Sequence, residues 1–117
     1  FSFLGHLHEM MGDKLSCVID AHAVPVLPGA WEAADACLYT AAGQRNRNHT
    51  GPFVRFENVP FPMEEILFDP QTSGGLLVAA APQDAAALEQ ELRAAGLPAA
   101  IVGEILEKQT TEITVNY

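Results

Sequence analysis

Residues 68–82 read FDPQTSGGLLVAAAP, a small polar segment followed directly by an apolar run. The apolar run, Gly75–Ala81, has the length and composition of a buried strand, so we expect a strand there. Asp69 precedes a proline, which disfavours helical dihedrals and predicts that the helix before it stops. The loop between this helix and the strand is unusually rich in small hydrogen-bonding residues. It therefore predicts either a binding site or a tight packing contact.

This loop offers side-chain donors and acceptors together with a backbone that a ligand can approach closely. Its candidate phosphate-facing or substrate-facing residues are Gln71, Thr72, Ser73, Gly74 and Gly75. Exposed N–H groups in such a loop can cradle an anion. Alternatively, the hydroxyls cap their own backbone and the loop packs against another domain. The loop is not a P-loop, because it lacks that motif's lysine.

Length and composition predict a single compact domain over residues 1–117. The chain is 49% hydrophobic and 18% charged, which supports a real core. No apolar run is long enough to cross a bilayer, and the first residues lack the features of a signal peptide. The net charge of −9 argues against nucleic-acid and anionic-membrane partners. The missing initiator methionine favours a piece of a longer or processed protein.

The two cysteines, Cys17 and Cys37, are too far apart in sequence for a short-spaced metal or redox motif. We expect two buried thiols in a reducing, cytoplasmic compartment, with a disulfide as the alternative.

The order of predicted elements favours an α/β or α+β fold, a mixed sheet with helices packed on it. The expected helices are Phe1–Met11, Gly29–Ala42, Pro62–Leu67 and one beginning at Pro82 and ending near Gly96. The expected strands are Lys14–Ile19, Gly75–Ala81, Ala99–Leu106 and Glu112–Tyr117, the last two joined as a hairpin. Phe53–Phe56 is expected as a short strand or an extended segment. Gly43–Pro52 reads as a polar loop.

The segment Gly43–Arg55 contains three arginines and no carboxylate, so it predicts a local positive patch. Arg47 and Asn48 are candidate phosphate-facing residues, because a guanidinium binds phosphate well when it is held in place. The alternative is a solvated, mobile loop. Glu64 and Glu65 are adjacent on a helix, so we expect them to point in different directions.

The remaining charged residues predict neither a metal site nor a catalytic group. His6 and Glu9 share a helix face, but one imidazole and one carboxylate do not make a metal site. No nucleophile motif is present, so we expect no catalytic residue in this chain.

Several stretches together resemble selenide, water dikinase, also called selenophosphate synthetase, in the aminoimidazole ribonucleotide synthetase superfamily. DPQTSGGLL closely resembles a segment of that family. FSFLGHLHEMM is similar to the end of its TDVTGFGLLGHL motif, and VPVLPGAWEAADA and IVGEIL are similar to later segments. Gly43 with Arg47–Asn48 is similar to its GGTxRN loop. The chain departs from these motifs at Ser2, Phe3, Gln44 and Arg45, and the family's magnesium-binding aspartate would precede Phe1.

The resemblance implies that residues 1–117 are the C-terminal domain of a longer, two-domain enzyme. Such an enzyme converts ATP, selenide and water to selenophosphate, AMP and phosphate with magnesium, and it is expected to be a cytoplasmic homodimer. The N-terminal domain, which binds most of the ATP and carries a reactive cysteine or selenocysteine, would be the partner of this chain. By itself the chain is expected to be inactive, with no bound cofactor or metal.

Two other interpretations remain open. One is a related superfamily member, such as a purine-biosynthesis synthetase or thiamine-monophosphate kinase. The other is a non-catalytic interaction domain.

Overall fold

The computed structural model describes residues 1–117 as helices packed on a small mixed sheet. In chain order the elements are α1 (Phe3–Met11), β1 (Leu15–Asp20), the 3-10 turn η1 (Ala21–Ala23), α2 (Ala30–Asp35), α3 (Ala41–Thr50), the 3-10 turn η2 (Gly51–Phe53), β2 (Val54–Glu57), α4 (Phe61–Phe68), α5 (Pro82–Ala94), β3 (Gly103–Glu107) and β4 (Ile113–Asn116). This architecture confirms the predicted fold class. None of the helices has the length and hydrophobicity needed to span a membrane.

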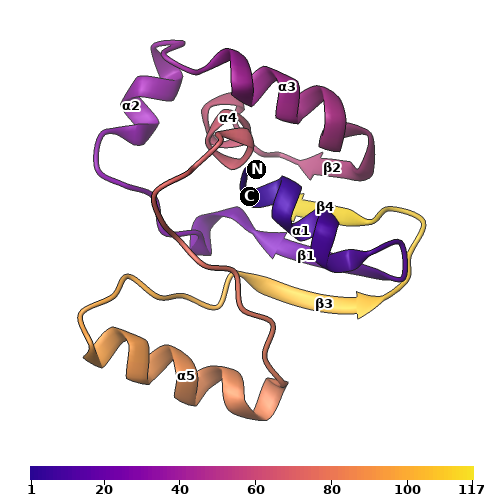
Figure 1. The fold of residues 1–117 in the computed structure, drawn as a ribbon, viewed down its shortest axis with the longest axis vertical. Coiled ribbons are helices and arrows are strands. Elements are labelled where there is room, and N and C mark those ends of the chain that lie inside the picture. Colours follow the sequence, from indigo (N-terminus) through magenta and orange to yellow (C-terminus); the bar gives the residue numbers. More distant parts are fainter.

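The sheet has the strand order β2-β4-β1-β3 (Figure 1). Strands β2, β4 and β1 run parallel, whereas β3 lies at the edge and pairs antiparallel with β1. The predicted hairpin between the last two strands is therefore wrong, because β1 separates β3 from β4. The connection between β3 and β4 passes the first residues of β1. There Ser16 Oγ accepts a hydrogen bond from Gln109 N (2.8 Å) and donates one to Thr111 O (3.1 Å).

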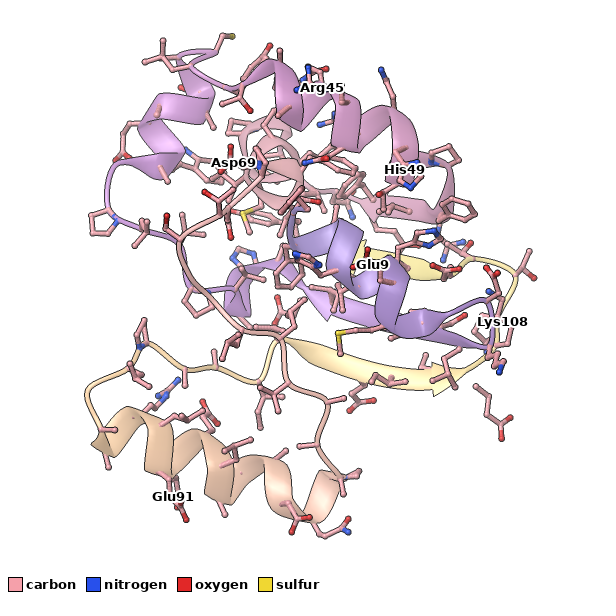
Figure 2. The ribbon with its side chains drawn as sticks, viewed as in Figure 1. Glu9, Arg45, His49, Asp69, Glu91 and Lys108 are labelled. Atoms are coloured by element: carbon pink, nitrogen blue, oxygen red, sulfur yellow. The ribbon has the colours of Figure 1, made fainter.

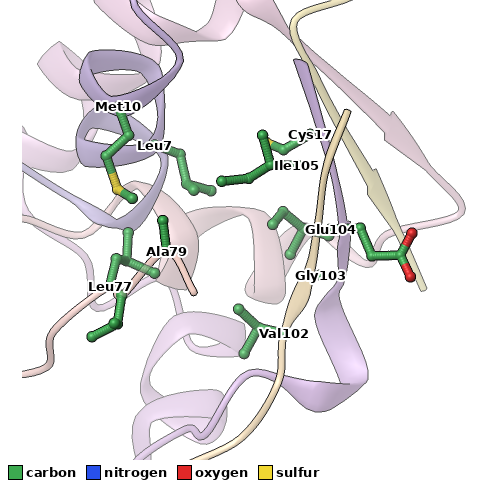
Figure 3. Close-up of a pocket in the computed structure, with 11 residues that line it drawn as sticks. Leu7, Met10, Cys17, Leu77, Ala79, Val102, Gly103, Glu104 and Ile105 are labelled. Atoms are coloured by element: carbon green, nitrogen blue, oxygen red, sulfur yellow. The ribbon is translucent and has the colours of Figure 1, made fainter. Parts of the chain in front are cut away.

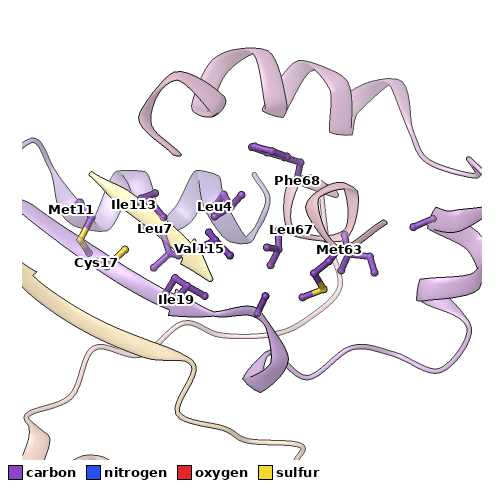
Figure 4. Packing of buried hydrophobic residues seen from close by; sticks show 13 residues of the cluster. Leu4, Leu7, Met11, Cys17, Ile19, Met63, Leu67, Phe68, Ile113 and Val115 are labelled. Atoms are coloured by element: carbon purple, nitrogen blue, oxygen red, sulfur yellow. The ribbon is translucent and has the colours of Figure 1, made fainter. Parts of the chain in front are cut away.

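One face of the sheet carries the hydrophobic core (Figure 4). The sheet contributes Cys17, Ile19, Ile113 and Val115, each at most 3% exposed, at alternating positions of β1 and β4. The helices α1 and α4 contribute Leu4, Leu7, Met11, Met63, Ile66, Leu67 and Phe68. Each such side chain stabilises the fold by about 1.5–3 kcal/mol when it is fully buried. The two helices and the sheet therefore form the stable centre of the domain.

Helix α1 has well-defined signals at both ends, which explains why its position was predictable. Ser2 Oγ accepts a hydrogen bond from Gly5 N at 3.0 Å and caps the first turn. Gly12 ends the helix with φ of 54°, a left-handed conformation that suits glycine. The predicted strand that follows is confirmed as β1, displaced by one residue.

Strand β3 approaches β1 so closely that one of its positions requires glycine. A Cβ atom at Gly103 would collide with the carbonyl oxygen of Val18 and lie 2.8 Å from Ile19 Cδ1. Gly103 pairs with Ile19 in the sheet. The absence of a side chain there lets the edge strand pair with β1.

Residues 43–52, predicted as a polar loop, mostly belong to helix α3, so that prediction is wrong. Thr40 caps this helix by accepting a hydrogen bond from Gly43 N at 3.0 Å. The long helix predicted over residues 29–42 is also wrong, because α2 ends at Asp35 and an irregular turn precedes α3. Helix α3 has few apolar residues with which to pack on the core. Its contacts with α4 stabilise it in place of such packing.

The predicted strand Gly75–Ala81 is wrong as well, because this segment is irregular and mostly exposed. Leu76 is 92% exposed and Val78 is 61% exposed, whereas Leu77 packs against the core. Figure 3 shows Leu77 beside a small, mainly apolar hollow between α1 and β3. The segment leads to α5, which buries no residue and stands apart from the other helices, beyond β3 (Figure 1).

Candidate functional site

The polar loop begins where the chain leaves α4, at Asp69 (Figure 2). Asp69 adopts an extended conformation, with φ of −61° and ψ of 135°, so the predicted end of the helix before Pro70 is confirmed. A tight turn follows, in which Gln71 N donates to Asp69 O at 2.9 Å. The candidate residues Gln71, Thr72, Ser73, Gly74 and Gly75 are all exposed. Their polar groups therefore face solvent rather than the core.

The two glycines of the loop serve its backbone conformation. Gly74 has φ of 153° and Gly75 has φ of 77°, both in the region that disfavours residues with a side chain. A Cβ atom at either position would meet no atom within 4 Å. Within this chain, no neighbour requires their small size. The open space beside them leaves the loop backbone accessible.

Arg47, a candidate phosphate-facing residue, is paired with carboxylates of α4. Its Nη2 and Nε contact Glu65 Oε1 at 2.6 and 2.9 Å, and its Nη1 contacts Glu64 Oε2 at 2.7 Å. The guanidinium also lies over the ring of Phe68, 4.7 Å from its centre. Asn48, the other candidate on α3, is exposed. The structure thus places Arg47 in a contact between α3 and α4.

These ion pairs correct two predictions made from the sequence. Glu64 and Glu65 do not act separately, because both reach the same guanidinium. The predicted positive patch is also largely neutralised, since Arg55 pairs with Glu57 at 3.0 Å. Arg45, on the outer surface of α3, remains as an exposed cation (Figure 2).

The sequence did not reveal the roles of three residues in this contact, Gln44, Asn46 and Glu65. The Glu65 side chain is only 1% exposed and also accepts a hydrogen bond from Gln44 Nε2 at 2.8 Å. Asn46 Nδ2 donates to Phe68 O at 2.9 Å. A signal for Glu65 was available, because a carboxylate within the apolar run Met63–Phe68 needs a buried partner. Nothing local identified Asn46, since its partner is distant in sequence.

A second polar cluster connects α1 to the start of β4. Glu112, which is 4% exposed, contacts His8 Nδ1 at 2.5 Å and Lys108 Nζ at 3.4 Å. The His8 ring also stacks on Phe53, with centroids 4.2 Å apart. No three His, Cys, Asp or Glu side chains come together as a metal site. This cluster therefore joins elements of the fold.

Burial changes the acidity of two groups. It raises the pKa of the Cys17 thiol to about 11, with a smaller contribution from the negative charge of Glu112. Partial burial also raises the pKa of the Asp69 carboxyl, at the entrance to the polar loop. Cys37 is exposed rather than buried as predicted, and both thiols are free. A buried thiol with a raised pKa is a poor nucleophile, so Cys17 has a packing role.

Comparison with known proteins places the sequence of this chain in a family. The family model described as "AIR synthase related protein, C-terminal domain" matches residues 1–116. The chain is 55% identical over 117 residues to a selenide, water dikinase of Agathobacter rectalis, covering 99% of this chain and 34% of that protein. It is 42% identical over 116 residues to one of Desulfitobacterium hafniense strain Y51, covering 97% of this chain and 33% of that protein. A selenide, water dikinase of Pelobacter propionicus is 46% identical over 118 residues, covering 98% of this chain and 34% of that protein.

These matches confirm the resemblance predicted from the sequence motifs. The chain spans about a third of the length of the curated relatives it matches.

Proposed function

This chain belongs to the AIR synthase related protein C-terminal domain family, and we propose that it serves as the C-terminal domain of a selenophosphate synthetase. The complete enzyme would convert ATP, selenide and water to selenophosphate, AMP and phosphate. The similarity to proteins named selenide, water dikinase over nearly the whole chain supports this function. Since the chain spans about a third of those proteins, the remaining length would supply most of the ATP site.

In this proposal the loop Gln71–Gly75 forms one wall of the substrate cleft. The observation that carries this role is the exposure of every residue of the loop. The amide of Gln71 and the hydroxyls of Thr72 and Ser73 would donate hydrogen bonds to phosphate oxygens. The backbone at Gly74 and Gly75 would come close to the ligand, because no side chain stands in the way. Such donors would position the phosphates and stabilise their charge.

No three His, Cys, Asp or Glu side chains of this chain converge into a complete metal site. We propose that the rest of the longer protein supplies metal ligands. Phosphoryl transfer needs fixed phosphates, metal and a positioned nucleophile. The chain alone supplies at most the first of these, so we expect no turnover from residues 1–117 in isolation.

Exposed apolar residues support a partner domain from the same enzyme. Leu76 and Val78 adjoin the loop, Ile101 precedes β3 and is 49% exposed, and Ile105 lies in β3 and is 45% exposed. An N-terminal domain seated on this surface would bury them and close the cleft beside the loop. The same surface also supports the second candidate function, a non-catalytic interaction domain.

The test is selenide-dependent AMP release by the full-length protein that carries this chain. We expect turnover with selenide and none with the substrates of a purine-biosynthesis synthetase or thiamine-monophosphate kinase. Thr72→Ala and Ser73→Ala should each lower turnover while the circular dichroism spectrum is unchanged. Thr110→Ala, at an exposed turn, is the matched control and should leave turnover unchanged. Full turnover in both loop variants would reject the cleft role and favour the interaction domain.

A further inference from the structure

Helix α3 contacts the last residue of α4, directly before the polar loop. Asn46 Nδ2 donates a hydrogen bond of 2.9 Å to the carbonyl oxygen of Phe68. The last carbonyls of a helix have no partner within the helix, so a side-chain donor there fixes the direction of the terminal peptide. Gly43 of α3 brings the helix backbone close, since a Cβ there would lie 3.8 Å from the same oxygen.

The orientation of α4 against α3 is fixed by a buried charged contact. Glu65 accepts from Gln44 at 2.8 Å and from Arg47 at 2.6 and 2.9 Å. Gln44 and Arg47 are three residues apart and therefore share the face of α3 that meets α4. The Phe68 ring is completely buried and lies beneath the guanidinium of Arg47. The final turn of α4 is thus held by its side chains as well as by its backbone.

The loop is also held at its downstream end. Leu77 is half-buried against the core, whereas the residues from Gln71 to Leu76 are all exposed. The loop therefore extends between two fixed points, Phe68 and Leu77. The exposed residues beyond the turn at Gln71 make few contacts, so the direction set at Phe68 and the contact of Leu77 together constrain where the loop lies.

We propose that Asn46 is a positioning residue for the loop Gln71–Gly75, supported by the contact between Arg47 and Glu65. It acts through the carbonyl of Phe68 and does not touch the substrate. This inference rests on the proposed function, because the loop it orients is the wall assigned to the phosphates. A small displacement of a positioning group lowers the rate by up to about 100-fold, so removal of this hydrogen bond should change kcat.

The test uses the full-length protein that carries this chain, with Asn46→Asp as the perturbation. The two side chains have nearly the same shape, but a carboxylate cannot donate to the Phe68 carbonyl and repels it. Gln90→Glu, the same amide-to-acid change at an exposed position of α5, is the matched control. Asn46→Ala removes the hydrogen-bond donor without adding charge. It is the alternative perturbation if Asn46→Asp does not fold.

Two readouts separate positioning from general stability. We expect kcat for selenide-dependent AMP release to fall about 10-fold or more, with KM for ATP changed less than about 2-fold. We also expect faster amide hydrogen exchange at the end of α4 and at Gln71, whose N–H groups are hydrogen-bonded, but not in β1 or β4. Gln90→Glu should change neither.

Unchanged kcat in both Asn46 variants would overturn the proposal, and so would a uniform rise in exchange across the domain. If the unmodified protein has no selenide-dependent turnover, the proposed function fails separately. Hydrogen exchange then tests by itself whether Asn46 holds the end of α4 in place. Unchanged exchange rates at the end of α4 in Asn46→Asp would reject this role, and a local rise would support it.

Discussion

Replacing Arg47 with methionine should destabilise the domain strongly, because the Glu65 carboxylate would remain buried without its cation. The Glu65 side chain is 1% exposed and accepts two hydrogen bonds from Arg47. Breaking a buried ion pair by removing one partner typically costs about 3–5 kcal/mol. Glu65 keeps its hydrogen bond to Gln44, so we place Arg47→Met at the low end, about 3 kcal/mol.

Urea unfolding measures this loss. The fluorescence of Trp31, the only tryptophan, reports on α2, which packs against α4. For a denaturant slope of about 2 kcal/mol/M, a loss of about 3 kcal/mol lowers the midpoint by about 1.5 M. Arg45→Met on the same helix, at an exposed position, is the control and should change stability by less than about 0.5 kcal/mol.

The double variant Arg47→Met with Glu65→Met tests the electrostatic reason itself. An apolar pair of similar volume is often as stable as the buried ion pair it replaces, so we expect stability to return to within about 1 kcal/mol of the original. The remaining carboxylate, Glu64, is 19% exposed and can be solvated. A loss below about 1 kcal/mol for Arg47→Met, or a double variant no more stable than the single one, would refute the reasoning.

Three further predictions concern other parts of the chain. Gly103→Ala should lower the free energy of unfolding in urea by about 1–3 kcal/mol, because its Cβ would collide with β1. Gly51→Ala is the control. A Cβ there would lie 3.9 Å from its nearest neighbour, so it should lower the free energy of unfolding by less than about 1 kcal/mol. Iodoacetamide at pH 8 should label Cys37 and spare Cys17, whose burial and raised pKa protect it until the protein unfolds; equal labelling of both thiols would contradict this. The pKa of the Asp69 carboxyl is higher in the folded protein than in the unfolded chain. The folded protein should therefore lose stability as the pH rises from the ordinary carboxyl pKa, about 4, through the raised pKa. Asp69→Asn should then be more stable than the original at pH 7 and lose this advantage at pH 3, as measured by urea unfolding; equal stability at pH 7 would count against it.

The elements that could be predicted from the sequence are those with local signals. Helix α1 has a capping serine and a terminal glycine, and α4 ends before Pro70 as expected. Helix α5 begins at Pro82 as expected, and Glu89 and Arg93 form an ion pair one turn apart on it, at 2.9 Å. Each of these features depends on residues within a turn or two of one another, so the chain pattern alone is sufficient.

The errors arise where distant parts of the chain meet. The apolar run Gly75–Ala81 has the composition of a strand, but a strand also requires a pairing partner, and none is present. Helix α3 looked like a loop because its polar residues are satisfied by α4, about 20 residues away. The order of β3, β1 and β4 is likewise non-local, so the short connection between β3 and β4 was mistaken for a hairpin.

The exposure of the polar loop could be predicted because it depends on local residues, whereas its role remains a proposal. The small polar residues at Gln71–Gly75 indicated an accessible loop, and the structure leaves all of them exposed. Whether such a loop binds a ligand or packs on a neighbour cannot be decided from its own residues. The role of Arg47 in joining two helices depends on Glu64 and Glu65, which lie 17 and 18 residues away. A guanidinium considered without its partners resembles a phosphate ligand.

Two residues of the exposed apolar surface, Leu76 and Val78, lie in the same continuous segment as the polar loop, so the proposed function would couple domain docking to the substrate cleft. Leu76 follows Gly75 directly, and Leu76 and Val78 are the large apolar side chains of the segment that the core leaves uncovered. Burying the two would recover about 1.5–3 kcal/mol each, so a domain that docks there gains stability from contacts beside the loop. A domain docked there would lie close to Thr72 and Ser73, since successive extended residues are only about 3.3 Å apart. We therefore expect Leu76→Asp in the full-length protein to weaken domain association and turnover together.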